Sequence, residues 1–174
     1  MGIINAFILS QMFMFLAMGT DFLSLQFKKR KQIYLTLMFS AALISGHYLL
    51  LGKITAGCMV FVSVLRFATC YFTTSKKYLF IFLALNTIIV FITFSEWYDL
   101  IIYVGLTIFI IGNFQKNDKL MRKQMMTGTS LIIVYNTLIF SPMGAIAESI
   151  FLIGNITGYY RHYIRKCNIV TKNK

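Results

Sequence analysis

The chain has 174 residues, of which 58% are hydrophobic and 13% are charged, with one proline and a mean hydropathy of +0.73. A water-soluble domain of this size needs more polar residues to cover its core, so the composition excludes one and indicates a lipid environment. The net charge of +12 would suit a nucleic-acid-binding protein. The basic residues lie between apolar segments, however, and the aromatic residues lie within them, which favours a membrane protein that binds no nucleic acid.

The sequence offers little for metal binding or catalysis. Cys58, Cys70 and Cys167 are an odd number of cysteines without Cys-x-x-Cys or Cys/His spacing, so neither a disulfide framework nor a metal site is expected. We find no Ser/His/Asp order, no usefully spaced carboxylate pair and no glycine-rich phosphate loop. The chain is therefore expected to have no cofactor and not to be an enzyme.

The charge clusters divide the chain into apolar segments that predict seven transmembrane helices. Helices are expected because a segment in lipid must satisfy its own backbone hydrogen bonds. The predicted fold is an all-α integral membrane protein. The predicted helices cover approximately residues 4–27, 33–51, 54–73, 78–94, 98–114, 125–140 and 142–164.

The basic residues predict an orientation in the membrane. With seven helices, one side of the bilayer receives the basic residues of segments 28–31, 76–77 and 116–123 and of the tail 165–174, whereas the other side receives Lys53 alone. Because positively charged loops remain in the cytoplasm, the amino terminus is expected outside and the carboxyl terminus inside.

The sequence also resembles itself at an offset of 88 residues. Lys28 then falls on Lys116, Lys31 on Lys119, and the pattern of loops repeats with them. Three helices enter and leave on opposite sides, so a second parallel copy requires a linking helix, as in SWEET transporters. The expected organisation is a first repeat at 4–73, a linker helix at 78–94, a second repeat at 98–164 and a basic cytoplasmic tail at 165–174.

Two stretches carry a family resemblance: "HYLLLGKITAGCMVFVSVLRF" at 47–67 and "AESIFLIGNITGYYR" at 147–161. With "SQMF" near the amino terminus, they resemble the YgjV-type bacterial inner-membrane protein family over nearly the whole chain, which implies that location but no activity. The architecture is more distantly similar to SWEET, PQ-loop and nicotinamide riboside transporters. That resemblance implies a small solute held between the third and seventh helices. Gln11 is similar to the PQ-loop glutamine, but Ser10 replaces the proline.

Arg66 is the most informative residue, because it lies near the middle of an apolar helix. Placing a charge there costs about 2.5 to 3.5 kcal/mol on insertion scales, so such residues usually face protein or a wet cavity. Counted at about 1.5 Å per residue, Arg66 and Asn155 lie at similar depths of about 20 Å. The repeat places them in equivalent helices, so we expect them to face each other.

Polar stripes through these two helices predict a wet cavity that binds a substrate. Glu148 is the obvious countercharge for Arg66, either directly as an ion pair or through water or solute. The alternative is that the polar residues only hold helices together. The predicted substrate-binding residues are Arg66, Asn155, Glu148, Ser63, Phe67 and Phe151.

Three further polar residues within the predicted helices, His47, Gln11 and Asn136, are candidates for a proton or polar relay. Histidine titrates near neutral pH and could pass protons with Glu148. The alternative is that each simply forms a hydrogen bond to a neighbouring helix.

These features together favour a small-solute transporter or facilitator of the bacterial inner membrane that works by alternating access between two three-helix bundles. The alternative from another class is a non-transporting membrane scaffold or partner subunit. The expected partners are the lipid bilayer and a small polar solute. The sequence leaves open whether the chain forms a homo-oligomer. The sequence does not identify the solute, its direction of transport or any coupled ion.

Overall fold

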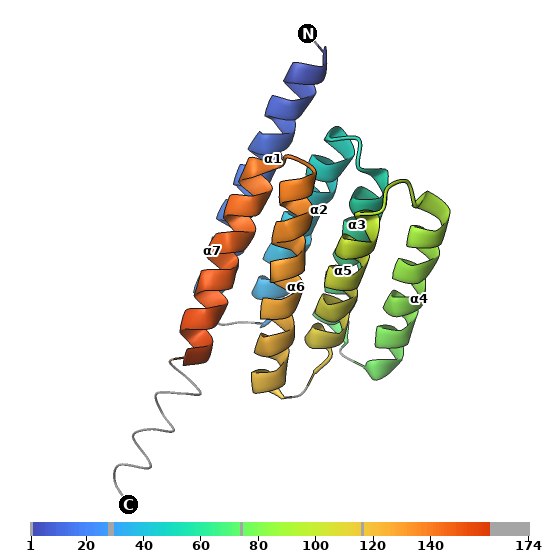
Figure 1. Cartoon of the computed structure of the whole chain (residues 1–174). Helices are drawn as coiled ribbons and strands as arrows, with labels where there is room; N and C mark the ends of the chain where they lie inside the picture. The colour runs from blue at the N-terminus through green and yellow to red at the C-terminus, as the bar shows by residue number, and fades with distance from the viewer. Residues whose placement is uncertain (1, 28–29, 74, 116, 161–174) are drawn as a thin grey trace, which may run out of the picture.

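The computed structural model describes residues 2–27, 30–73, 75–115 and 117–160. These residues form seven helices and no strand, which confirms the predicted all-helical class (Figure 1). Successive helices run up and down, as short connections require. The helices are α1 (Gly2–Gln26), α2 (Arg30–Leu50), α3 (Ile54–Phe72), α4 (Lys76–Thr93), α5 (Asp99–Asn113), α6 (Asp118–Leu138) and α7 (Pro142–Tyr159).

Most helix bounds lie within a few residues of the predicted ones, but α6 begins at Asp118 and not at residue 125. Asn117 explains the difference, because its side-chain oxygen accepts hydrogen bonds from the backbone N–H groups of Lys119 and Leu120, at 3.0 and 3.2 Å. Such a cap stabilises the first turn of a helix. Basic residues that were predicted to lie in a loop are therefore helical. The predicted tail 165–174, loop residues 28–29 and the predicted end of the last helix at 164 lie outside the described residues.

Four helices among the described residues are long and apolar enough to cross a membrane, with candidate spans at Ile4–Ser24, Lys31–Leu50, Ile54–Phe72 and Lys76–Thr93. Two shorter apolar helices, α5 and α7, are about 22 to 27 Å long at the usual helical rise, slightly less than the hydrocarbon core of about 30 Å. The remaining helix, α6, begins with charged residues. Length and composition thus support a membrane protein.

The helices pack as two groups and one peripheral helix. In the first group α2 packs against both α1 and α3, and in the second α6 packs against both α5 and α7. The groups meet where α1 packs against α7 and where α3 packs against α5. Among the described residues, helix α4 packs mainly against α3 and α5 and lies at the edge of the bundle (Figure 1). The interior between the groups is therefore formed without α4.

Glycines let α5 and α6 approach closely within the second group. A Cβ atom on Gly128 would lie 3.1 Å from the carbonyl oxygen of Gly105, and one on Gly105 would lie 3.2 Å from Cγ1 of Ile132. Small residues at such crossings are usual in membrane bundles, where close backbone packing replaces hydrophobic driving force.

Large apolar side chains cover the outside of the molecule. On α4, Phe80, Phe91 and Ile92 are 70 to 80% exposed. Contiguous apolar surface of this kind is rare on soluble proteins, and it matches the hydrocarbon of a bilayer.

Candidate functional site

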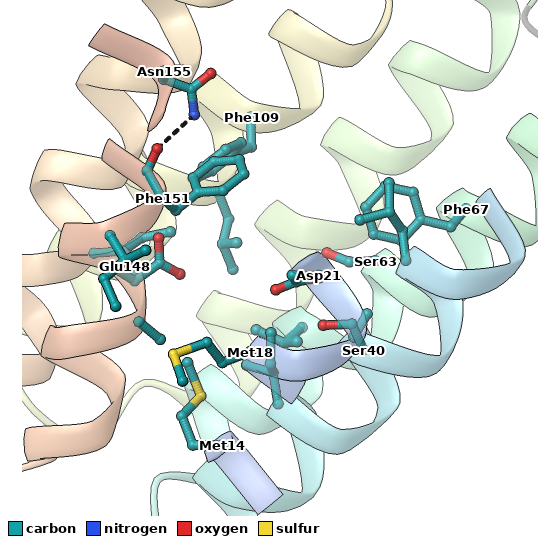
Figure 2. Close-up of a pocket in the computed structure, with 18 of the residues that line it drawn as sticks. Met14, Met18, Asp21, Ser40, Ser63, Phe67, Phe109, Glu148, Phe151 and Asn155 are labelled. Atoms are coloured by element: carbon teal, nitrogen blue, oxygen red, sulfur yellow. Dashed lines mark hydrogen bonds between the residues drawn. The ribbon is translucent and has the colours of Figure 1, made fainter. Parts of the chain in front are cut away.

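A cavity of about 310 Å³ lies between the two helix groups (Figure 2). Its lining residues come from α1, α2, α3, α5, α6 and α7, and within the described part of the chain none comes from α4. Apolar side chains form most of the wall, and methionine, leucine, isoleucine and phenylalanine are the larger ones among them. The polar and charged residues of the lining are Asp21, Ser40, Tyr48, Ser63, Arg66, Arg122, Glu148 and Asn155.

Arg66 is only 3% exposed and lines this cavity. Its Cζ atom lies 5.0 Å from the centre of the Phe67 ring, which is within the range of a cation–π interaction. Among the described residues, however, its Nε and Nη1 atoms have no hydrogen-bond partner. Leaving buried donors of a charged group unpaired is costly, so these two nitrogens mark Arg66 as a candidate for binding a solute or water.

Two carboxylates face the same space. Figure 2 shows Glu148 on α7 and Asp21 on α1 pointing into the cavity from opposite sides, with Ser40 and Ser63 beside Asp21. Nε and Nη1 of Arg66 form no hydrogen bond to either acid. The cavity therefore contains acidic and basic side chains that are not paired through these two nitrogens.

All six residues predicted to bind substrate line the cavity: Arg66, Asn155, Glu148, Ser63, Phe67 and Phe151. Asn155 donates a hydrogen bond from Nδ2 to the carbonyl oxygen of Phe151 at 3.1 Å (Figure 2). Its amide therefore bonds to its own helix. Asn155 and Arg66, which were expected to face each other, both line the cavity. Substrate binding by these residues stays a prediction.

The three predicted relay residues lie elsewhere, in a hydrogen-bonded cluster that we name the polar layer. Within it, Nδ1 of His47 lies 2.8 Å from the carbonyl oxygen of Ser10 and Nε2 lies 2.9 Å from Oγ of Ser141. A carbonyl oxygen only accepts, so Nδ1 donates and Nε2 accepts from the serine hydroxyl. Both ring nitrogens are satisfied. The polar layer consists of Ser10, Gln11, His47, Tyr48, Asn136 and Ser141.

The other two relay candidates, Gln11 and Asn136, are also hydrogen-bonded. Oε1 of Gln11 accepts a hydrogen bond from the backbone N–H of Met143 at 3.2 Å. Oδ1 of Asn136 accepts one from the Tyr48 hydroxyl at 3.1 Å. None of the three candidates lines the cavity, so the structure does not bring them to Glu148 through it.

The turn between α6 and α7 builds one side of the polar layer. Phe140 adopts a positive φ of 55°, and the Ser141 side chain caps α7 by accepting from the backbone N–H of Gly144 at 3.3 Å. A Cβ atom on Gly144 would lie 2.6 Å from Oδ1 of Asn136, so only glycine fits at this contact. The layer is tightly packed as a result.

The polar layer lies toward the end of the bundle that carries Lys53, and Tyr48 belongs both to this layer and to the cavity lining. Of its members, Ser10, His47, Tyr48, Asn136 and Ser141 are at most 1% exposed. The Tyr48 ring also packs 5.8 Å from the fully buried Tyr135 ring. In the other direction the lining extends to Arg122 in the second turn of α6.

Sequence reasoning missed two charged residues of the lining. Asp21 lies near the end of an apolar segment and Arg122 in the basic segment 116–123, and both contribute to the cavity. A signal for Asp21 was present, because Met14, Met18 and Asp21 follow the spacing of one helix face. Asp99, another acidic residue near the end of an apolar segment, is also buried. It is 2% exposed, and its Oδ2 accepts hydrogen bonds from Thr55, Ser95 and Glu96.

The fold and composition define a multi-helix membrane protein with a charged internal cavity. A family model of the bacterial inner membrane protein family Imp-YgjV matches residues 8–166. The chain belongs to this family, which confirms the resemblance seen in the sequence. No curated protein and no solved structure matches the chain.

Proposed function

We propose that the protein is a small-solute transporter or facilitator of the bacterial inner membrane, with its binding site in the cavity. The observation that carries the proposal is the position of the cavity. It lies between the two helix groups, all six helices of these groups line it, and it contains a buried arginine with open donors. Solute sites of secondary transporters lie in the same way between structural repeats.

The packing of the helices supports two parallel repeats. If α1 corresponds to α5 and α3 to α7, then the contacts of α1 with α7 and of α5 with α3 are the same contact made twice. The hydrogen bond between Tyr48 and Asn136 joins residues 88 positions apart, the offset of the sequence repeat. Residues near a two-fold axis meet their own equivalents, so the 3+1+3 organisation with α4 as linker is part of the proposal.

We extend the proposal to orientation. Lys76, Lys77, Lys119 and Lys123 lie toward one end of the bundle, and Lys53 with Glu96 lies at the other (Figure 1). If all seven helices cross the bilayer, the end with more lysines faces the cytoplasm. The amino terminus is then outside and the carboxyl terminus inside.

We infer that the structure represents an inward-facing form of the transporter. In this form the buried polar layer closes the cavity on the outside, and the cavity opens toward the cytoplasmic end near Arg122. His47 on α2 bonds to Ser141 beside α7, and Tyr48 on α2 bonds to Asn136 on α6. In an outward-facing form these contacts between the groups separate, and the two bundles rock around the site.

A non-transporting scaffold or partner subunit is the second candidate. The hydrogen bonds of His47, Gln11 and Asn136 favour it, because they show polar residues holding helices together. This candidate predicts a static bundle, which gives a direct test.

The test measures access to the cavity from each side of the membrane. In a variant without the native cysteines, Ser63→Cys places a thiol in the cavity. A membrane-impermeant thiol reagent should label it both in intact cells and in inverted membrane vesicles, because the site alternates. The control Ser45→Cys should stay unlabelled, since Ser45 is buried and bonds to the carbonyl oxygen of Gly57 at 2.9 Å. Labelling from one side only, or from neither, would contradict alternating access.

A further inference from the structure

We propose that the cavity binds a small zwitterion, such as an amino acid with an apolar side chain, with its carboxylate at Arg66 and its ammonium group at Asp21 and Glu148. This inference rests on the proposed function and names the substrate class of the same site. It goes beyond the family assignment, which identifies a membrane protein without a ligand.

Arg66 defines the anionic end of the ligand. A guanidinium presents donors in a planar arrangement that matches a carboxylate, and such bonds are short and strong because both partners are charged. Nε and Nη1 of Arg66 are buried and have no acceptor among the described residues. A carboxylate bound at the cavity wall would supply the missing acceptors if the Arg66 side chain turned toward it, because both nitrogens are buried in the present conformation.

Asp21 and Glu148 define the cationic end. They come from α1 and α7, the helices that meet at one junction of the two groups, and both point into the cavity (Figure 2). An ammonium group has three donors and no acceptor, so it can bond to both carboxylates and to a nearby hydroxyl such as that of Ser40.

The balance of charges favours a ligand that carries both signs. The lining holds two basic side chains, Arg66 and Arg122, and two acidic ones, Asp21 and Glu148. A simple anion would meet the two carboxylates, and a simple cation would meet the two guanidinium groups. Like charges brought together in the site disfavour the wrong ligand, and opposite charges attract the right one.

The walls and the volume define the rest of the molecule. Phe109 and Phe151 lie above Glu148 in Figure 2, and Met14 and Met18 lie below it. Such side chains accommodate an aliphatic or aromatic group. The cavity volume of about 310 Å³ is at the lower end of ligand sites, which run from about 300 to 1,000 Å³. A single amino acid is of the appropriate size.

The test is calorimetric binding to the purified full-length chain in lipid nanodiscs. The probes are leucine, methionine and phenylalanine, each with the amine that lacks its carboxylate and the acid that lacks its amino group. We expect at least one zwitterion to bind about tenfold or more tightly than both of its singly charged analogues, because each analogue leaves one set of charges in the cavity unpaired. Equal or tighter binding of the analogues, or no binding of any zwitterion, would overturn the assignment.

Variants assign the two ends. Arg66→Met should abolish zwitterion binding, while the amine keeps its weak affinity. The double variant Asp21→Asn with Glu148→Gln should reduce zwitterion binding, while the acid keeps its weak affinity.

The matched controls are Lys76→Met and Glu96→Gln, exposed residues away from the cavity, which should bind like the unmodified chain. Arg66→Lys keeps the charge without the planar donors and should bind the zwitterion more weakly but measurably. Thermal unfolding shows which variants are folded. If zwitterion binding is lost only in variants that no longer show a cooperative unfolding transition, the assignment is contradicted.

The outcomes separate the two proposals. If Ser63→Cys is labelled from both sides but no zwitterion is preferred over its analogues, transport stands and the zwitterion assignment is wrong. If labelling is one-sided, the transport proposal fails whatever the cavity binds.

Discussion

His47 and Arg66 are both buried side chains with basic nitrogens, in neighbouring helices that pack against each other. Both nitrogens of His47 are hydrogen-bonded, to α1 and to the turn before α7. Two nitrogens of Arg66 have no partner within the described residues, and the side chain lines a cavity. The sequence places both residues in the same category of polar groups within apolar helices.

The difference separates two roles of polar residues in this protein. In the polar layer each hydrogen bond joins groups that packing has already brought together, so these residues hold the two bundles in one arrangement. In the cavity lining, two nitrogens of Arg66 lack such partners among the described residues, which sets this side chain apart. An unpaired charge beside a cavity, more than depth or residue type, distinguishes Arg66 from His47.

Breaking the polar layer should produce the largest loss of stability. His47→Leu removes the hydrogen bonds to the carbonyl oxygen of Ser10 and to Oγ of Ser141. Both partners are fully buried, and each stranded group costs about 1 to 3 kcal/mol, so we expect a loss of about 2 to 6 kcal/mol in unfolding free energy. The measurement is unfolding in mixed micelles with increasing SDS.

The matched control for this variant is Thr137→Val, which deletes an exposed hydrogen bond to the carbonyl oxygen of Ile133 at 2.9 Å. We expect a change below about 0.5 kcal/mol. A similar loss in both variants would show that the polar layer has no special role in holding the bundles together.

Crowding the same layer should have a somewhat smaller effect. Gly144→Ala introduces a Cβ atom 2.6 Å from Oδ1 of Asn136 and 2.7 Å from Oγ of Ser141, so the layer must shift at a cost of about 1 to 3 kcal/mol. Gly154→Ala on the same helix is the control, because nothing lies within 4 Å of its added Cβ. Unfolding should be easier for the first variant and unchanged or harder for the second, and the reverse order would refute this view of the packing.

The two regions were not equally predictable from the sequence. Apolar segments between charges were enough for the seven helices, and the polar stripes of α3 and α7 indicated six residues that share the cavity. The partners of His47 come from 37 and 94 positions away. No local pattern encodes such distances, because they depend on how α1, α2 and α7 pack.

Charge patterns alone also gave the wrong position for some residues, where packing or helix capping outweighs the preference of charges for the membrane surface. A carboxylate near a basic loop usually lies at the membrane surface, but Asp21 is one helical turn deeper than the end of α1 and lines the cavity. Likewise the basic residues of α6 suggested a loop, whereas the cap from Asn117 extends the helix through them. The cap residue was visible in the sequence, and the burial was not.

Asn86 on α4 offers a comparison between paired and unpaired amides away from the cavity. It is 1% exposed, and both its amide atoms lack partners among the described residues. Asn86→Leu should therefore raise the unfolding free energy by about 1 kcal/mol, since an unsatisfied buried amide is replaced by an apolar group of similar size. Asn136→Leu is the counterpart and should lower stability, because it strands the Tyr48 hydroxyl. An equal loss in both variants would contradict the distinction.

Arg66→Met should change stability little, by less than about 1 kcal/mol, even though the residue is almost fully buried. A guanidinium that faces a hydrated cavity exchanges solvation for apolar packing when it is replaced, and the two effects nearly cancel. A structural ion pair with Glu148 predicts the opposite: each of Arg66→Met and Glu148→Gln would then cost about 3 to 5 kcal/mol, and the double variant would recover most of it. Unfolding of all three variants in mixed micelles decides between these outcomes. Strong losses in the single variants with recovery in the double would place Arg66 with His47 as a structural residue and remove the main support for a solute site.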